Sequence, residues 1–188
     1  MKKLSVVIGV MFAVNVFAGL VGFDLKDDAA VYGLLDDKMS GSITNSGLIV
    51  TVAASDGVMN RTTSGFGING EGADDTDGLN AGQYLDLVFN QKVSFSTLNI
   101  SSWGASDAGE VRLGPSFVSQ GGISGSGDTE YDFMVDAGDI VRIIATTDSG
   151  ATNGFSVNGF SVVVPEPAVF CLVALGGGTL MLCRKRKR

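Results

Sequence analysis

The sequence predicts an all-β protein built around a single β-sandwich domain at residues 19–164. Short runs rich in Val, Ile, Phe and Tyr recur there between turn-forming residues, which is typical of a sandwich or barrel with many short strands. The same region holds 23 of the chain's 27 glycines and a single proline. No part of it shows a sustained helical period. We expect about eight to ten strands, enough for two packed sheets in one domain.

Seven runs have a strong strand pattern and three have a weaker one. In the clearest, Leu85, Leu87 and Phe89 alternate with Tyr84, Asp86 and Val88, which predicts a strand with at least one buried face. A tight polar link, Asn90–Lys92, joins it to the next run. The strong candidates are Gly47–Ala54, Tyr84–Asn90, Val93–Trp103, Glu110–Leu113, Glu130–Asp136, Asp139–Thr147 and Phe155–Val164, and the weaker ones are Val21–Lys26, Ala30–Leu35 and Arg61–Gly67.

A direct duplication lies in the last predicted strand, where Asn-Gly-Phe-Ser-Val occurs twice in succession. Phe155 and Phe160 are five residues apart, so a regular strand would place them on opposite faces. A bulge at Asn158-Gly159, with glycine supplying an unusual φ, would return both rings to one core. A hairpin turn at the same place is the alternative, but its arms would be too short to stand alone. We therefore favour the bulge.

The N-terminus has the pattern of a signal peptide at residues 1–18. A basic start at Met1–Lys3 precedes the apolar run Leu4–Phe17, and Ala18 ends a Val-Phe-Ala sequence suited to signal peptidase. We predict cleavage after Ala18 and a mature chain from Gly19. The alternative is an uncleaved anchor, but the apolar run is shorter than the roughly 20 residues that a stable span needs.

The C-terminus, residues 165–188, has the pattern of a membrane-directed tail. Val-Pro-Glu-Pro at 164–167 precedes the apolar run Ala168–Cys183, predicted to be a transmembrane helix. Cations at the end of such a run stay on the cytoplasmic side and stop transfer. These stop-signal residues are Arg184, Lys185, Arg186, Lys187 and Arg188.

Together these features resemble the PEP-CTERM sorting signal of Gram-negative bacteria. The resemblance implies that Pro165, Glu166 and Pro167 form a recognition site for exosortase, a membrane-bound cysteine-protease-like enzyme. It implies that the protein is anchored in the inner membrane in transit and then reaches the cell surface or extracellular matrix. Members of the family are associated with exopolysaccharide and biofilm. A plain single-pass anchor, in which the prolines only break the helix, is the alternative.

The segment Gly67–Phe89 is also similar to a stretch found in exported domains of this family, where an acidic, glycine-rich loop precedes a strand ending in Phe. This similarity implies a jelly-roll-like sandwich. The predicted architecture is thus one such domain, flanked by the signal peptide and the sorting helix.

Charge and composition exclude several function classes. Residues 19–167 contain 20 acidic and six basic residues, a net charge of −14, which argues against nucleic acid or anionic lipid as a partner of this part. The chain has no histidine, so catalytic triads and His-ligated zinc are excluded. Both cysteines lie in the tail. We predict a protein that is not an enzyme, with a small carboxylate-based glycan hydrolase as the remaining catalytic alternative.

One acidic loop is a candidate calcium site. Oxygen donors on a flexible, glycine-rich loop suit Ca²⁺, which takes six to eight of them, although the spacing is not that of an EF-hand. A solvated acidic loop is the alternative interpretation. The candidate ligands are Asn69, Glu71, Asp74, Asp75 and Asp77.

Other residues suggest a second function, that of a carbohydrate-binding module. Sugar rings stack on aromatic side chains, and in a sandwich of this size the same residues also serve as core. Alternating carboxylates on a predicted strand are expected to face solvent, because they repel one another. Asp86, on another predicted strand, could equally face solvent. The aromatic residues are Tyr32, Tyr84, Trp103 and Tyr131; the carboxylates are Asp128, Glu130 and Asp132. Glycosylation sequons at Asn60 and Asn99 are treated as chance matches.

Overall fold

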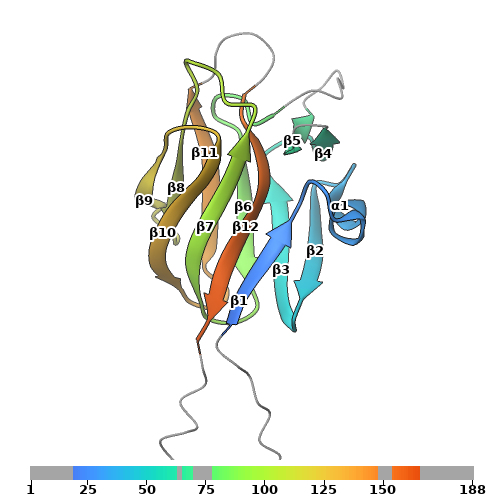
Figure 1. The fold of residues 1–188 in the computed structure, drawn as a ribbon, viewed down its shortest axis with the longest axis vertical. Helices are drawn as coiled ribbons and strands as arrows, with labels where there is room; N and C mark the ends of the chain where they lie inside the picture. Colours follow the sequence, from blue (N-terminus) through green and yellow to red (C-terminus); the bar gives the residue numbers. More distant parts are fainter. Residues whose placement is uncertain (1–18, 63–64, 70–77, 148–153, 166–188) are drawn as a thin grey trace, which may run out of the picture. The chain divides into compact units, whose positions relative to one another are not determined.

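The computed structural model describes residues 19–62, 65–69, 78–147 and 154–165, all within one compact unit, Gly19–Pro165. These residues form two antiparallel sheets, packed face to face, and one short helix (Figure 1). The expectation of an all-β sandwich is confirmed. The predicted signal peptide and sorting helix lie outside the described residues, among which no helix has the length and apolar character to cross a membrane.

The first sheet has the strand order β10-β7-β12-β5-β4, and β1 pairs with β12 next to β5. β12 is therefore flanked by β7 on one side and by β1 and β5 on the other. The strands of the first sheet are β1 Gly19–Asp24, β4 Val58–Thr62, β5 Gly65–Asn69, β7 Val93–Ser101, β10 Gly127–Val135 and β12 Ser156–Val164.

The second sheet has the order β2-β3-β6-β11-β8-β9. The predicted link Asn90–Lys92 carries the chain from β6 in this sheet to β7 in the other. Burial alternates along β6 as its sequence predicts, with Leu85, Leu87 and Phe89 buried. The strands of the second sheet are β2 Ser40–Asn45, β3 Leu48–Ala54, β6 Tyr84–Phe89, β8 Ala108–Leu113, β9 Val118–Ile123 and β11 Ile140–Thr147.

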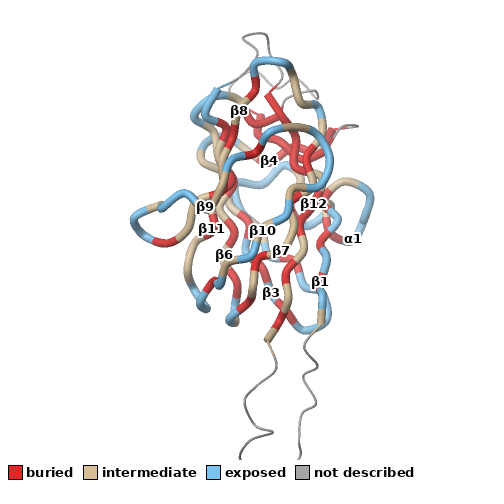
Figure 2. Tube along the Cα trace, turned by 60° about the vertical axis from the view of Figure 1, so that its left-hand side comes forward, coloured by how far each residue is buried: buried red, intermediate tan, exposed pale blue. Residues whose placement is uncertain are grey.

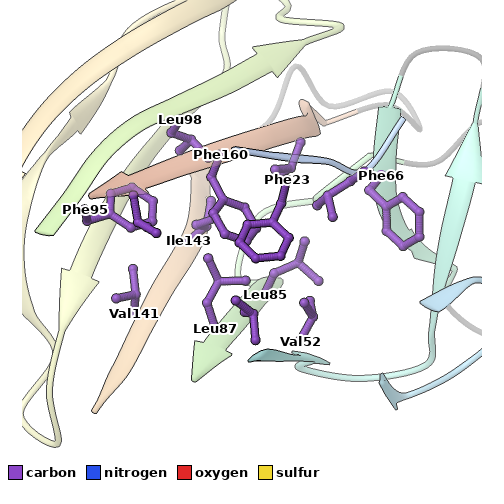
Figure 3. Packing of buried hydrophobic residues seen from close by; sticks show 14 of the residues in the cluster. Phe23, Val52, Phe66, Leu85, Leu87, Phe95, Leu98, Val141, Ile143 and Phe160 are labelled. Atoms are coloured by element: carbon purple, nitrogen blue, oxygen red, sulfur yellow. The ribbon is translucent and has the colours of Figure 1, made fainter. Parts of the chain in front are cut away.

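The core lies between the sheets and is centred on aromatic rings. The Phe160 ring of β12 stacks on Phe23 of β1 at 5.0 Å between centroids and on Phe95 of β7 at 6.1 Å. It also meets Phe89 of β6 edge-on at 6.2 Å, so it joins the two sheets. Figure 3 shows the Phe23, Phe95 and Phe160 rings above aliphatic side chains of the opposite sheet, and Figure 2 marks buried residues along the strands.

The predicted bulge in β12 is confirmed, but Gly159 is required there for a different reason than the one expected. The pairing of β12 with β7 shifts between Val157 and Gly159, which leaves Asn158 as the extra residue, and both Phe155 and Phe160 are buried in the same core cluster. Gly159 does not have a positive φ. A Cβ there would instead overlap the backbone carbonyl oxygen of Phe23. Glycine is needed because β1 approaches so closely, and not for an unusual backbone angle.

Two of the weaker strand predictions need correction. Ala30–Leu35, predicted as a strand, belongs to helix α1, Ala29–Leu35. The Asp28 side chain caps this helix by accepting the Ala30 N–H at 2.9 Å, and Val31 and Leu35, four residues apart, are its buried residues. Arg61–Gly67 covers the end of β4 and the start of β5, and residues 63–64 lie outside the described part.

Three strands lie outside the runs proposed from sequence, apart from overlap at their ends. β2 and β9 are rich in Ser, Thr and Gly, with one buried apolar side chain each, Ile43 and Ile123. β4 was anticipated only in its last residues. The described residues thus contain twelve strands, above the predicted eight to ten.

Side chains close the sandwich along both of its long sides. On one side, the Asn45 amide of β2 donates a hydrogen bond to the Gly22 carbonyl oxygen of β1 at 2.7 Å. On the other, the Tyr131 hydroxyl of β10 donates to the Gly122 carbonyl oxygen of β9 at 3.4 Å. These bonds satisfy backbone groups at places where one sheet ends beside the other.

Tyr131 makes the stability of the domain sensitive to alkaline pH. Burial raises its pKa to about 12 from an ordinary value near 10. The folded state therefore favours the neutral phenol. The contribution of buried Tyr131 to the free energy of unfolding is complete below about pH 10 and is lost as pH rises towards about 12. We expect the wild type to lose more stability between about pH 9 and about pH 11 than Tyr131→Phe does, as measured by thermal melting. An identical pH dependence in both proteins would contradict this.

A cluster around Arg142 covers the outer face of the second sheet. Arg142 of β11 donates two hydrogen bonds of 2.8 Å to the two carboxylate oxygens of Asp86 on β6. Its guanidinium lies over the Tyr84 ring at 3.5 Å and over the Phe117 ring at 3.7 Å. The hydrogen bond to Asp86 raises the pKa of Arg142. The sequence analysis allowed Asp86 to face solvent, but Asp86 is the ion-pair partner of Arg142. Each of these two charged side chains is less than one-fifth exposed.

We expect Arg142→Lys to lower the free energy of unfolding by about 1–2 kcal/mol, because lysine loses the planar fork and the stacking on two rings. Urea denaturation measures the change. Arg112→Lys is the matched control. Arg112 is opposite Arg142 in the β8–β11 register and pairs with Glu110, but among the described residues no aromatic ring lies over its guanidinium. We expect the control to change stability by less than about 0.5 kcal/mol; equal losses would refute the role of the stacked rings.

Candidate functional site

An open cleft of about 740 Å³ lies where β1, β12, β7 and β10 run side by side in the first sheet. Burial alternates along β1, so Leu20, Gly22 and Asp24 are exposed on the side away from the core. Figure 1 shows these four strands together at the front of the domain. The lining residues are Leu20, Gly22, Phe23, Asp24, Lys26, Asp27, Asp28, Thr97, Asn99, Asp128, Asn158, Gly159, Phe160 and Ser161.

Small residues keep the cleft open. Gly22 of β1 pairs with Ser161 of β12, and a Cβ built on Gly22 would meet no atom within 4 Å. Gly159 of β12 also lines the cleft, but its missing side chain makes room for the backbone of β1. The strands are therefore covered here by little more than their own backbone, which creates the hollow.

A chain of side-chain hydrogen bonds crosses three strands beside the cleft. The Ser101 hydroxyl of β7 donates to Asn158 Oδ1 at 2.8 Å, and Asn158 Nδ2 donates to Asn99 Oδ1 at 2.7 Å. Asn99 Nδ2 in turn donates to Asp128 Oδ1 on β10 at 2.5 Å. Every donor in this chain points towards the carboxylate, so the orientation of both amide groups is determined.

The other side of the cleft is formed by the turn between β1 and α1. Asp24 Oδ1 accepts hydrogen bonds from the backbone N–H groups of Lys26 at 3.0 Å and Asp27 at 2.8 Å, which is an Asx-type turn. The Asn158 carbonyl oxygen accepts from the N–H groups of Leu25 at 2.8 Å and Lys26 at 3.2 Å. The β12 bulge thus fixes the turn that borders the cleft.

The charged side chains that line the cleft are mostly acidic. Asp24, Asp27, Asp28 and Asp128 line it, with Lys26 as the one basic residue. Across the part of the chain that the structure describes, no three acidic or cysteine side chains are grouped so that they could hold an ion. The cleft therefore offers a field of negative charge together with amide and hydroxyl groups.

The residues of the predicted calcium site are described only in part. Asn69, at the end of β5, is buried, and its Oδ1 accepts a hydrogen bond from Asn60 Nδ2 at 2.9 Å. This hydrogen bond occupies one of the two lone pairs of the Asn69 amide oxygen. Glu71, Asp74, Asp75 and Asp77 lie outside the described residues, so calcium binding remains a prediction.

The residues predicted to form the sorting signal are also mostly outside the described part. Pro165 is the last described residue, directly after β12, while Glu166, Pro167, Ala18 and residues 184–188 are not described. The expected exposure of the carboxylates on β10 is confirmed, since Asp128, Glu130 and Asp132 all face solvent. Only Asp128 lines the cleft.

The four aromatic residues considered for sugar stacking do not form a common surface. Each is partly buried against a different side chain, and none of the four lines the cleft. Trp103 stacks on Phe155 at 5.3 Å, and Arg61 lies over Tyr32 at 4.1 Å. Tyr84 contacts Arg142 and Tyr131 contacts Phe95.

The sequence did not reveal the polar residues of the cleft. Asn99 and Asn158 lie on strands that are far apart in the chain, and each matched a different pattern, a sequon and a bulge. Their proximity follows from the pairing of β7 with β12. No local sequence signal would have found them.

No protein-family model matches the chain, and a search of curated proteins finds no match.

Proposed function

We propose that this chain is an exported, non-enzymatic protein of the cell surface or extracellular matrix of a Gram-negative bacterium. In this proposal, signal peptidase removes residues 1–18, and the C-terminal helix holds the protein in the inner membrane. Exosortase then processes it at Pro165–Pro167. The mature protein is associated with exopolysaccharide in a biofilm.

The pairing of the two ends of the domain supports this proposal. Gly19 is opposite Val164 in the antiparallel pairing of β1 and β12, and Figure 1 shows both residues' strands meeting at one end of the domain. The proposed signal peptide ends directly before Gly19, and the proposed sorting tail starts directly after Val164. A signal peptide and a stop-transfer tail cross the membrane in opposite directions. Adjacent, antiparallel attachment points suit a domain that is joined to one membrane surface at both ends until signal peptidase acts.

The strand order also supports a jelly-roll-like architecture for the exported domain. The four strands β1-β12-β7-β10 in the first sheet face β6-β11-β8-β9 in the second. Along the chain, these eight strands follow the pattern of two Greek keys in two sheets. In this proposal, α1 and strands β2–β5 form an insertion between the first and second strands of the jelly roll.

The test is intact-mass analysis of the protein recovered from the native cell surface. We expect a mature form that begins at Gly19 and lacks Arg184–Arg188. A form that retains the five terminal basic residues would refute exosortase processing and favour a simple membrane anchor. A form that retains residues 1–18 would refute cleavage of the signal peptide.

A further inference from the structure

We propose that the cleft formed by β1, β12, β7 and β10 binds a linear polysaccharide that lacks carboxylate and sulfate groups. The inference rests on the proposed function, because it names the matrix component that the exported domain would hold. Three independent features support it: the shape of the cleft, its hydrogen-bonding groups and its charge.

The shape suits an extended chain of sugar rings. The floor is four strands wide, or about 14 Å at about 4.8 Å between strands. The volume of the cleft, about 740 Å³, lies within the ~300–1,000 Å³ typical of ligand sites. The space above Gly22 is empty to at least 4 Å from a Cβ position. Leu20, which is 69% exposed, offers an apolar surface to the C–H face of a sugar.

The polar groups match sugar hydroxyls. Each hydroxyl both donates and accepts a hydrogen bond. Asn99 and Asn158 each have a second amide N–H, and Asp128 has a second oxygen, that no described residue engages. The chain of hydrogen bonds from Ser101 holds these groups in place before any ligand arrives, so little side-chain entropy is lost on binding.

The charge of the cleft selects against anionic polymers. Four carboxylates and one lysine line it, so a polysaccharide with carboxylate or sulfate groups would be repelled. Neutral sugars, and sugars with protonated amino groups, share the polyhydroxyl chemistry without this repulsion. Phe23 and Phe160 line the cleft, but both are buried and their rings stack on one another in the core. They offer no aromatic surface for a sugar ring, so we expect weak binding to a single site, strengthened where many sites meet one polymer.

The experiment measures binding of three defined hexasaccharides to the mature protein from the cell surface by titration calorimetry. The probes are a chitin hexamer, its fully de-N-acetylated counterpart and an alginate hexamer. We expect saturable binding of the first two and none of alginate. The cationic hexamer should bind more tightly only at low salt, since screening removes that advantage. Failure of both non-anionic probes to bind, or equal binding of alginate, would overturn the proposal.

Variants locate the binding site. Gly22→Tyr places a ring in the open cleft on an exposed strand position, and we expect at least a tenfold loss of affinity. Gly33→Tyr is the matched control, because Gly33 on α1 is also exposed and open to at least 4 Å but does not line the cleft; its affinity should be unchanged. Thermal melting shows that each variant is folded. Unchanged binding by Gly22→Tyr would overturn the assignment of the site.

Asn99→Ala gives a second measure, because it removes an amide at the centre of the hydrogen-bond chain. We expect at least a fivefold loss of affinity with a small change in the melting midpoint. Release of reducing ends from either hexamer would overturn the binding role in favour of a hydrolase. The outcome is separable from that of the mass analysis, since a protein that keeps its terminal basic residues still reports on the cleft.

Discussion

Phe160→Ala is expected to lower the free energy of unfolding by about 3–5 kcal/mol, the usual cost of removing a buried phenylalanine ring. The Phe160 ring contacts Phe23, Phe95 and Phe89, which belong to three other strands in both sheets. Its loss leaves a cavity at the point where the two sheets meet, and neighbouring rings on strands cannot collapse fully into it. Urea denaturation measures the change.

Phe133→Ala is the comparison for this prediction. Phe133 also stacks on Phe95, at 5.3 Å, but it is only partly buried at the side of the core. We therefore expect a loss of about 1–2 kcal/mol, in proportion to the smaller apolar area removed from water. Equal losses from the two variants would show that Phe160 does not join the sheets as described.

Gly159→Ala is expected to lower the free energy of unfolding by about 3 kcal/mol, at the upper end of the range for overpacking. The added methyl group would overlap the backbone carbonyl oxygen of Phe23, and a backbone atom cannot rotate away as a side chain can. β1 must shift along β12 or separate from it. Hydrogen exchange should then be faster at Leu25 and Lys26, whose N–H groups bond to the Asn158 carbonyl oxygen.

Gly22→Ala is the matched control for that prediction, because Gly22 lies on the strand paired with Gly159. Its Cβ would meet no atom within 4 Å, and its φ is not positive. Alanine therefore fits without strain, and we expect an unchanged or slightly higher stability, by up to about 1 kcal/mol. A loss at Gly22 as large as that at Gly159 would rule out steric overlap as the cause.

Local sequence patterns predicted those elements whose burial alternates strongly. β6 was predicted because large apolar residues occur at every second position, and β12 because they do so on either side of its bulge. The bulge was predicted because Phe155 and Phe160 both had to be buried. β2 and β9 were missed because each buries a single isoleucine among Ser, Thr and Gly. Their place in the sheet depends on neighbouring strands and not on their own apolar content.

Helix α1 was predicted wrongly because a seven-residue segment rich in Val, Tyr and Leu suits a strand as well as a helix. The deciding residue is Asp28, whose side chain caps the first turn. The sequence did not show why position 159 must be glycine. A side chain there would overlap the backbone carbonyl oxygen of Phe23, which lies at the opposite end of the domain sequence. The cleft could not be predicted for the same reason, since its residues come from four strands and one turn.

The pairing of the first strand with the last has a consequence for the timing of folding. Strand β1 carries Phe23 into the core, but its partner β12 is the final element of the domain to be synthesised. During the proposed export, the N-terminal segment therefore waits without its partner until almost the whole domain has crossed the membrane. Contacts between such distant segments make folding slow, and an unpaired strand is prone to aggregate meanwhile. Completion of translocation and closure of the sandwich would then be the same event.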